Sequence, residues 1–322
     1  MHHSQTQTEA SSPPERNRYA AGCAWIEGCY VPISEARIPI LDVGFVRSDL
    51  TYDVVGVWEG RFFRLADHLA RLERGCERIR LTSPVAREEL LDILQGVVGR
   101  SELREAYVET VITRGVPGPG ERDPRLWKPR LYVYAIPYVW IVRPELQETG
   151  TDVIVARDTR RIPPGAVDPR VKNFQWGDLV RGLFEAYDRD AWLPILTDGD
   201  GHVTEGPGFN VFAVVGTRLY TPDRGVLEGI TRLTTIEIAH EQGLEVHVDE
   251  LPVSRLYDAD EIFLTSTAGG VMPVARLDGR QVGTGKPGPV TTRIRNRYWE
   301  LHSDPRYTLE VDYGGNARSA NT

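Results

Sequence analysis

The sequence predicts an α+β protein with two domains. Stretches typical of strands and of helices intermix along its 322 residues. Clean β-α-β repeats, with strands that are apolar on both faces, are missing, which disfavours a doubly wound sheet. The length fits one large or two medium domains, and the character of the chain changes after Arg143-Pro144. We therefore predict a polar, disordered leader at 1–20, a small α+β domain at 21–142, a linker at 143–149 and a larger α+β domain at 150–322.

Hairpins, helices and strands can be placed in the first half by their turns and periods. Gly28 and Gly60 each lie in a short turn between two strand-like runs. Leu65, Leu69 and Leu72 recur near the helical period. In chain order we expect strands at 24–26, 29–31, 52–57 and 61–63, helices at 65–81 and 87–98, and strands at 106–113 and 131–142.

The second half continues the mixture without internal repeats. We expect strands at 152–156, 194–197, 210–215 and 262–266, and helices at 178–189, 231–241 and 289–301. The order of these elements favours an α+β domain over a parallel α/β sheet.

Charge and cysteine content exclude several classes of function. The net charge of −8 and pI of about 5.5 argue against nucleic-acid binding. No apolar run approaches the roughly 20 residues that span a bilayer, and the polar N-terminal stretch is not a secretory signal. Cys23, Cys29 and Cys76 lack the spacing of a metal site, so we expect free thiols, no metal and a cytoplasmic protein. A small, buried or half-buried role fits Cys29 better than a nucleophile.

Lys172 is the first candidate for chemistry. Only three of the 38 basic residues are lysines. Lys128 and Lys286 each precede a proline, which favours extended or turn backbone. Lys172 instead follows the turn Asp168-Pro169 and precedes Phe174 and Trp176. Lysine alone among common side chains condenses with aldehydes, which arginine cannot do. An exposed loop lysine is the alternative interpretation.

Downstream segments suit a phosphorylated heteroaromatic ligand. Glu205, followed by Gly206 and Gly208, could face a pyridine nitrogen and keep it protonated. Gly229-Ile230-Thr231 opens a predicted helix, whose free N–H groups bind phosphate. A turn acid and an ordinary helix cap are the alternatives.

Two further segments could contact the same phosphate. The small turn Ser266-Thr267-Ala268-Gly269-Gly270 permits close approach of backbone, and Arg71, on the helix predicted at 65–81, could supply a counter-charge. Gly283-Thr284-Gly285-Lys286-Pro287-Gly288 matches a dinucleotide motif, but Pro287 removes an N–H and no buried strand precedes it. A surface loop fits that segment better.

Taken together, these segments resemble the fold-type IV pyridoxal-phosphate aminotransferases, which include branched-chain and D-amino-acid aminotransferases. The resemblance covers roughly residues 20–315 and is greatest to the (R)-selective amine transaminases. The segments that carry it are Phe45–Val54, Trp58–Leu65, Arg160–Asp178, Leu196–Asn210, Tyr220–Leu227 and Asp260–Phe263.

The resemblance implies a role for each candidate residue. Lys172 would form the Schiff base with pyridoxal 5′-phosphate and transfer the proton, and Glu205 would bind the pyridine nitrogen. The phosphate would be held by Arg71, Ile230, Thr231 and Thr267, with Tyr52 and Trp176 lining the substrate pockets. A homodimer with sites at the interface, and ping-pong transfer from (R)-amines to an oxo acid such as pyruvate, are also implied.

Two departures from the (R)-amine transaminases concern the carboxylate of the oxo acid. Those enzymes usually carry histidine where this chain has Arg47. The arginine of their loop after Thr113-Arg114-Gly115 falls here at Gly120, with Arg122 two residues later. Arg47, expected on the strand with Tyr52, or Arg122 could bind the carboxylate instead. A D-amino-acid aminotransferase, an aminodeoxychorismate lyase and a coenzyme-binding protein without activity are the remaining alternatives.

Overall fold

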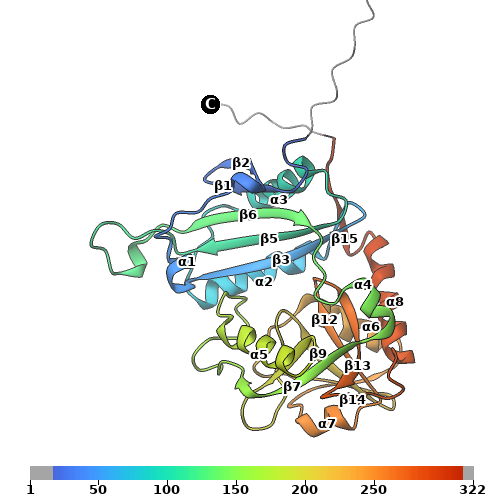
Figure 1. Ribbon diagram of the computed structural model, residues 1–322. Coiled ribbons are helices and arrows are strands. Elements are labelled where there is room, and N and C mark those ends of the chain that lie inside the picture. Colours follow the sequence, from blue (N-terminus) through green and yellow to red (C-terminus); the bar gives the residue numbers. More distant parts are fainter. Residues whose placement is uncertain (1–16, 315–322) are drawn as a thin grey trace, which may run out of the picture.

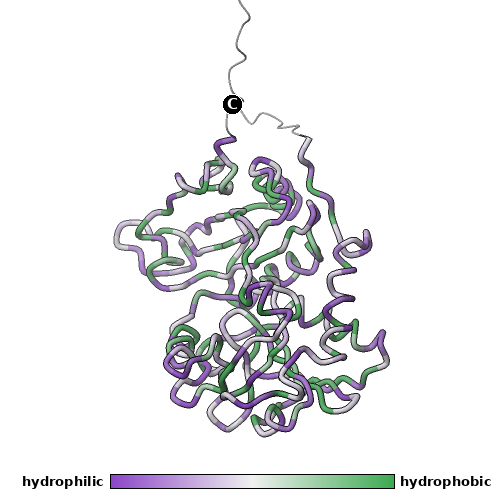
Figure 2. Tube along the Cα trace, turned by 45° about the vertical axis from the view of Figure 1, so that its right-hand side comes forward, coloured by the Kyte–Doolittle hydropathy of each residue, from purple (hydrophilic) through white to green (hydrophobic). Residues whose placement is uncertain are grey.

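The computed structural model describes residues 17–314, which form two bodies, each built on its own sheet (Figure 1). This arrangement confirms the predicted α+β class. Residues 1–16 of the expected leader lie outside the described residues. Apolar stretches run through both bodies, where the strands bury their side chains (Figure 2).

The first sheet is antiparallel throughout, in the order β15-β4-β3-β5-β6-β1-β2. Its strands are β1 (Cys23–Ile26), β2 (Cys29–Pro32), β3 (Leu50–Trp58), β4 (Arg61–Phe63), β5 (Ala106–Thr113), β6 (Arg130–Pro137) and β15 (Thr308–Glu310). Helices α2 (Leu65–Arg78) and α3 (Arg87–Ser101) cover one face and share the main apolar core with it. The opposite face carries Tyr52, Val54 and Tyr132.

The second sheet is mixed, in the order β11-β10-β9-β12-β13-β7-β8, with β14 paired to β13. Its strands are β7 (Thr151–Arg160), β8 (Leu193–Thr197), β9 (Asn210–Val215), β10 (Arg218–Thr221), β11 (Glu245–Val248), β12 (Glu261–Ser266), β13 (Gly270–Leu277) and β14 (Arg280–Gln281). The helices of this half are α5 (Gly177–Asp188), α6 (Ile230–Glu241), α7 (Val253–Tyr257) and α8 (Pro289–Glu300). Residues from β9, β12 and β13 contribute to its core.

Several predicted boundaries were wrong. The strand expected to reach residue 142 ends at Pro137, and the following segment turns so that Tyr138 and Trp140 pack against each other. The strand expected at 152–156 continues to Arg160. The segment expected as a linker contains the short helix α4 (Pro144–Thr149). Strand β15, far down the chain, pairs with β4 of the first sheet. The boundary between two domains stays a prediction.

Helix α1 (Val43–Arg47) was not predicted and corrects the placement of Arg47. Asp42 caps the helix by accepting a hydrogen bond from the Gly44 N–H at 2.8 Å, and Ser48 ends it in the left-handed conformation. Strand β3 begins only at Leu50. Arg47 is therefore the exposed last residue of a short helix and not part of the strand.

Candidate active site

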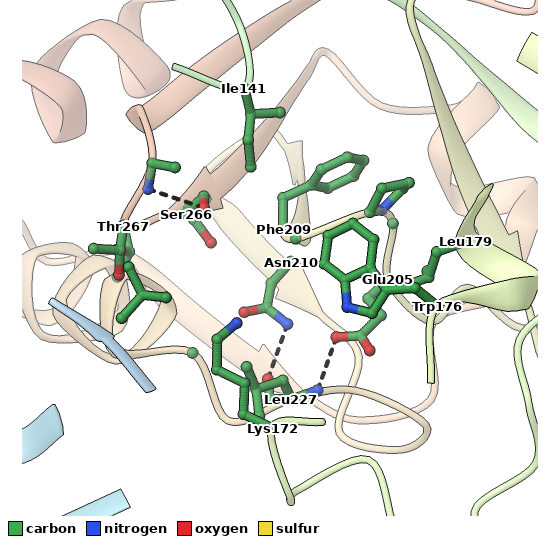
Figure 3. Close-up of a pocket in the computed structure, with 18 of the residues that line it drawn as sticks. Ile141, Lys172, Trp176, Leu179, Glu205, Phe209, Asn210, Leu227, Ser266 and Thr267 are labelled. Atoms are coloured by element: carbon green, nitrogen blue, oxygen red, sulfur yellow. Dashed lines mark hydrogen bonds between the residues drawn. The ribbon is translucent and has the colours of Figure 1, made fainter. Parts of the chain in front are cut away.

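A cavity of about 340 Å³ lies where the two bodies meet. Tyr52, Val54 and Tyr107 reach it from the first sheet, and most of its remaining lining comes from the second half of the chain. Figure 3 shows the side chains that project into it. The cavity brings together eight of the ten residues singled out from the sequence: Tyr52, Arg71, Lys172, Trp176, Glu205, Ile230, Thr231 and Thr267. Its volume is that of a site for a small organic ligand.

Lys172 lies in the loop between β7 and α5, and this loop is attached to the first sheet. The carbonyl oxygen of Lys172 accepts hydrogen bonds from the Tyr52 N–H and the Thr51 hydroxyl, each at 3.0 Å. The side chain is half-buried, and its Nζ lies 4.6 Å from the centre of the Tyr52 ring. No proton-accepting side chain pairs with Nζ among the described residues. The amine is thus held in the cavity with its backbone fixed.

Glu205 lines the cavity with a buried side chain, and each of its carboxylate oxygens accepts a hydrogen bond. One accepts a hydrogen bond from Arg161 Nε at 3.1 Å. The other accepts a hydrogen bond from the Leu227 N–H at 2.8 Å (Figure 3). Burial raises the pKa of Glu205, while Arg161, the Leu227 N–H and Lys172 counteract that rise. Arg161 is itself held by Asp178 at 2.6 Å. The result is an acid with a fixed orientation toward the cavity.

Helix α6 begins beside the cavity without a side-chain cap. Gly229 is its N-cap, and Thr231 is the second helical residue. The N–H groups of the first turn have no partners within a helix and are left for a ligand. A Cβ on Gly229 would lie 2.2 Å from the Asn210 amide oxygen, so only glycine fits there. We call residues 229–231 together with Thr267 the α6 cradle.

Arg71 reaches the α6 cradle from helix α2 and is held by Asp53 of β3. Its Nε and Nη2 donate to the two Asp53 oxygens, each at 2.8 Å, and its Nη1 donates to the Glu228 carbonyl at 3.2 Å. His68, one turn earlier on α2, places Nδ1 2.7 Å from the same carboxylate. All three side chains are buried. Burial raises the pKa of Asp53, but Arg71 and His68 outweigh that effect and lower the pKa below its usual range.

Aromatic side chains form the walls of the cavity. Tyr52, whose ring centre lies 4.6 Å from that of Phe174, lines one side. Trp176 lies on another side (Figure 3). Phe209 and Ile141 complete the apolar side. These surfaces suit an apolar substituent of a substrate.

Arg47 and Arg122 do not line the cavity of their own chain. Arg47 is exposed and lies over the Trp127 ring, with its guanidinium carbon 5.5 Å from the ring centre. Arg122 is exposed in the loop between β5 and β6. Within residues 17–314 neither side chain forms an ion pair. Their expected contact with the carboxylate of the oxo acid stays a prediction.

Sequence reasoning did not identify Asp53, Arg161 or Glu109. Asp53 directly follows Tyr52 in a strand-like run, and Arg161 lies just before the proline-rich turn at 162–165. Both are charged residues in stretches that otherwise predict strand or turn. Glu109 is a charged residue within the run 106–113 that otherwise predicts a buried strand. A charge within such a run needs a partner, and that is the signal that could have found them.

The comparison with known families is decisive. The model for amino-transferase class IV matches residues 50–277, well over half of the chain. The chain belongs to the class IV aminotransferases.

Relatives of this class IV aminotransferase cover most of its length. The D-alanine aminotransferase of Bacillus licheniformis is 30% identical over 81% of this chain and 90% of its own. The branched-chain-amino-acid aminotransferase of Escherichia coli K12 is 29% identical over 86% of this chain and 92% of its own. The structure of the T.th. branched-chain amino acid aminotransferase with pyridoxamine 5′-phosphate has a TM-score of 0.84 and 29% identity, covering 91% of this chain and 99% of that one.

Membership of this class makes the protein a transferase that uses pyridoxal 5′-phosphate and acts on amino and oxo acids. The cavity fits that coenzyme, because an amine, a buried acid and an uncapped helix start border one space. The relatives are named for branched-chain and D-alanine substrates. No helix within residues 17–314 is long and apolar enough to cross a membrane. The same residues contain no cluster of side chains suited to a metal ion.

Proposed function

We propose that this aminotransferase transfers an amino group from (R)-amines to an oxo acid such as pyruvate. The observation that carries the proposal is the state of the two arginines that line the cavity. Arg71 is paired with Asp53, and Arg161 is paired with Glu205 and Asp178. Neither offers the free, bidentate partner that the carboxylate of an amino acid needs. A donor without a carboxylate meets no such need, and the carboxylate of the oxo acid would be bound by an arginine from outside this lining, such as Arg47 or Arg122.

Glu109 is a buried acid that lies next to Tyr107 and does not itself line the cavity. Its side chain is buried, accepts a hydrogen bond from Tyr107 at 3.2 Å and lies near Lys172 and Tyr134. Burial raises the pKa of Glu109, and Lys172 and the two tyrosines oppose that rise. An acid at this place supplies no cation that could bind a carboxylate of the substrate.

The proposed roles of the residues follow from their positions. The coenzyme, when bound, supplies a ring that accepts electrons from the carbon losing its proton. Lys172 Nζ holds the coenzyme and then moves that proton. Glu205 keeps the pyridine nitrogen protonated, while Arg71 and the α6 cradle hold the phosphate. Tyr52 and Trp176 orient the substituents of the amine.

A panel of amino donors tests this proposal. We expect (R)-1-phenylethylamine to change the coenzyme absorbance at least tenfold faster than its (S) enantiomer, roughly 1.4 kcal/mol of discrimination. D-alanine, L-alanine and L-leucine serve as comparison donors. Faster reaction with D-alanine would favour a D-amino-acid aminotransferase, an alternative that Arg47 and the relative from Bacillus licheniformis support. Faster reaction with L-leucine would favour the branched-chain class, and pyruvate release without an acceptor would favour a lyase.

We further infer that the protein is a homodimer with its sites near the interface. Large apolar side chains are exposed around α1 and the nearby loop of Leu126: Ile38, Ile40, Leu41, Phe45, Val46 and Leu126, each 47–70% exposed. A second hollow of about 560 Å³ lies beside them on the first sheet. An exposed apolar patch of this kind is typical of an interface. The free thiols of Cys23, Cys29 and Cys76 favour the cytoplasm as its location.

Replacing Arg47 or Arg122 by alanine is expected to raise the KM for pyruvate without slowing the half-reaction with (R)-1-phenylethylamine. The amine carries no carboxylate, whereas pyruvate needs a cationic partner in a partly dry pocket. We expect roughly a tenfold effect or more from the residue that binds the acid. Arg122, on a loop rich in glycine and proline, is the stronger candidate for pyruvate, and Arg47 for D-amino acids. Unchanged pyruvate kinetics in both variants would exclude both arginines.

A mixed dimer identifies the subunit that supplies the arginine. In a dimer of one Lys172→Ala chain and one Arg122→Ala chain, the only intact lysine lies in the chain without Arg122. If Arg122 acts across the interface, that site is complete and the KM for pyruvate is normal. If Arg122 acts within its own chain, the KM stays high. The same design with Arg47→Ala assigns the other arginine, and failure to form mixed dimers would contradict the dimer.

A further inference from the structure

Arg71 does not present a full positive charge to the α6 cradle. Its Nε and Nη2 donate to the Asp53 carboxylate, and Arg71 and Asp53 together carry no net charge. The groups of the α6 cradle itself, which are backbone N–H groups and threonine hydroxyls, are neutral. A phosphate dianion would therefore enter a buried place that lacks a compensating charge, which is costly.

His68 contacts the carboxylate that pairs with Arg71, and its ring could supply the missing charge. Because the Asp53 carboxylate can only accept, Nδ1 of His68 carries a proton in their 2.7 Å contact. His68 also borders a small cavity that is lined by Ile230, Thr231 and Thr267. Within residues 17–314 no group forms a hydrogen bond with Nε2 of His68. His68 thus stands directly behind the α6 cradle with one nitrogen unused.

The surroundings of His68 leave it neutral in the absence of the phosphate. Burial lowers the pKa of His68, Asp53 partly reverses that change, and Arg71 lowers the pKa further. Asp67, next to it on α2, is paired with Arg64. The groups facing the small cavity from other elements are Tyr138, Tyr298 and His302. Burial lowers the pKa of His302 to about 4 and Tyr298 has a raised pKa, so neither contributes charge.

We propose that His68 takes up a proton when the phosphate of the coenzyme binds, and that Asp53 links this charge to Arg71. Protonated His68, ionised Asp53 and Arg71 then carry one net positive charge, which faces the dianion through a chain of hydrogen bonds. Asp53 and His68 are positioning residues, since they act on the phosphate through Arg71. The inference rests on the proposed phosphate site and deepens it.

The sign of the pH dependence follows from this proton uptake. Between the pKa of His68 in the free protein and its higher value in the complex, each bound phosphate brings one proton with it. The affinity therefore falls as pH rises, by up to about tenfold per pH unit. The phosphate itself loses its second proton near pH ~6, so measurements from pH 7 upward leave its charge constant.

Calorimetry of pyridoxamine 5′-phosphate binding to the full chain, stripped of coenzyme, tests the proposal. Titrations at pH 7.5 in two buffers of different ionisation enthalpy count the protons taken up. His68→Asn keeps a donor for Asp53 but cannot titrate. We expect it to take up about one proton fewer than the wild type and to bind roughly tenfold more weakly. Asp53→Asn should lose the same proton, because His68 no longer faces a carboxylate.

His302→Asn is the matched control, since His302 borders the same small cavity and its Nδ1 donates to the Tyr298 carbonyl. It should take up protons as the wild type does. An NMR spectrum of the wild-type protein with ¹⁵N-labelled histidine provides a readout that needs no variant: one histidine should become an imidazolium on binding. Equal proton uptake in wild type and His68→Asn, or no new imidazolium, overturns the inference alone. Failure of the wild type to bind pyridoxamine 5′-phosphate overturns the proposed site as well.

Discussion

Lys172→Ala is expected to abolish both the yellow colour of the protein with pyridoxal 5′-phosphate and all measurable transamination. Lys172 is the only one of the three lysines that lines the cavity. Lys128 and Lys286 are exposed in other loops. No other side chain in the cavity can form the covalent bond, because the arginines of the cavity cannot condense with the aldehyde. Absorbance in the visible and the rate of the half-reaction measure the two effects separately.

Lys286→Ala is the matched control for this experiment. It removes an amine of the same kind from an exposed loop and should leave colour and rate unchanged. If the Lys172→Ala protein still forms an adduct with the coenzyme that borohydride fixes, the assignment of Lys172 is wrong. We expect the variant to fold, because the carbonyl oxygen of residue 172 can still accept the hydrogen bonds from β3. Circular dichroism checks this expectation.

Glu205→Gln is expected to leave the coenzyme bound but to slow the half-reaction by roughly ten- to a hundredfold. A neutral amide cannot hold the pyridinium proton, and a charge-assisted hydrogen bond is worth about 1.5–3 kcal/mol. The geometry favours a local effect: the amide oxygen can still accept from the Leu227 N–H, and Arg161 keeps Asp178 as a partner. Single-turnover absorbance measures the rate, and coenzyme content after dialysis measures retention.

The exposed Glu250 offers a control with the same substitution, since its side chain contacts only Arg224 and His202 at the surface. Glu250→Gln should match the wild type. A half-reaction of the Glu205→Gln variant at nearly the wild-type rate would mean that the carboxylate faces another part of the coenzyme.

The regular elements of the fold could be predicted because local patterns determine them. The runs at 106–113 and 210–215 match β5 and β9 residue for residue. Their β-branched and aromatic residues favour strands wherever they pack. Strand β15 was missed because its three residues pair with a strand more than two hundred positions earlier. No local pattern contains that contact, and tertiary packing overrides propensity in so short a segment.

The sequence by itself determined the family, the coenzyme and the eight predicted residues that line the cavity, because these depend on residue types in a set order along the chain. Only the tertiary structure decided how those residues are supported. It paired Arg71 with Asp53 and His68, paired Glu205 with Arg161, and moved Arg47 from a strand to the end of a short helix. Such pairings join side chains on different elements, and their charges and pKa values depend on burial, which appears only when the two sheets enclose a common cavity.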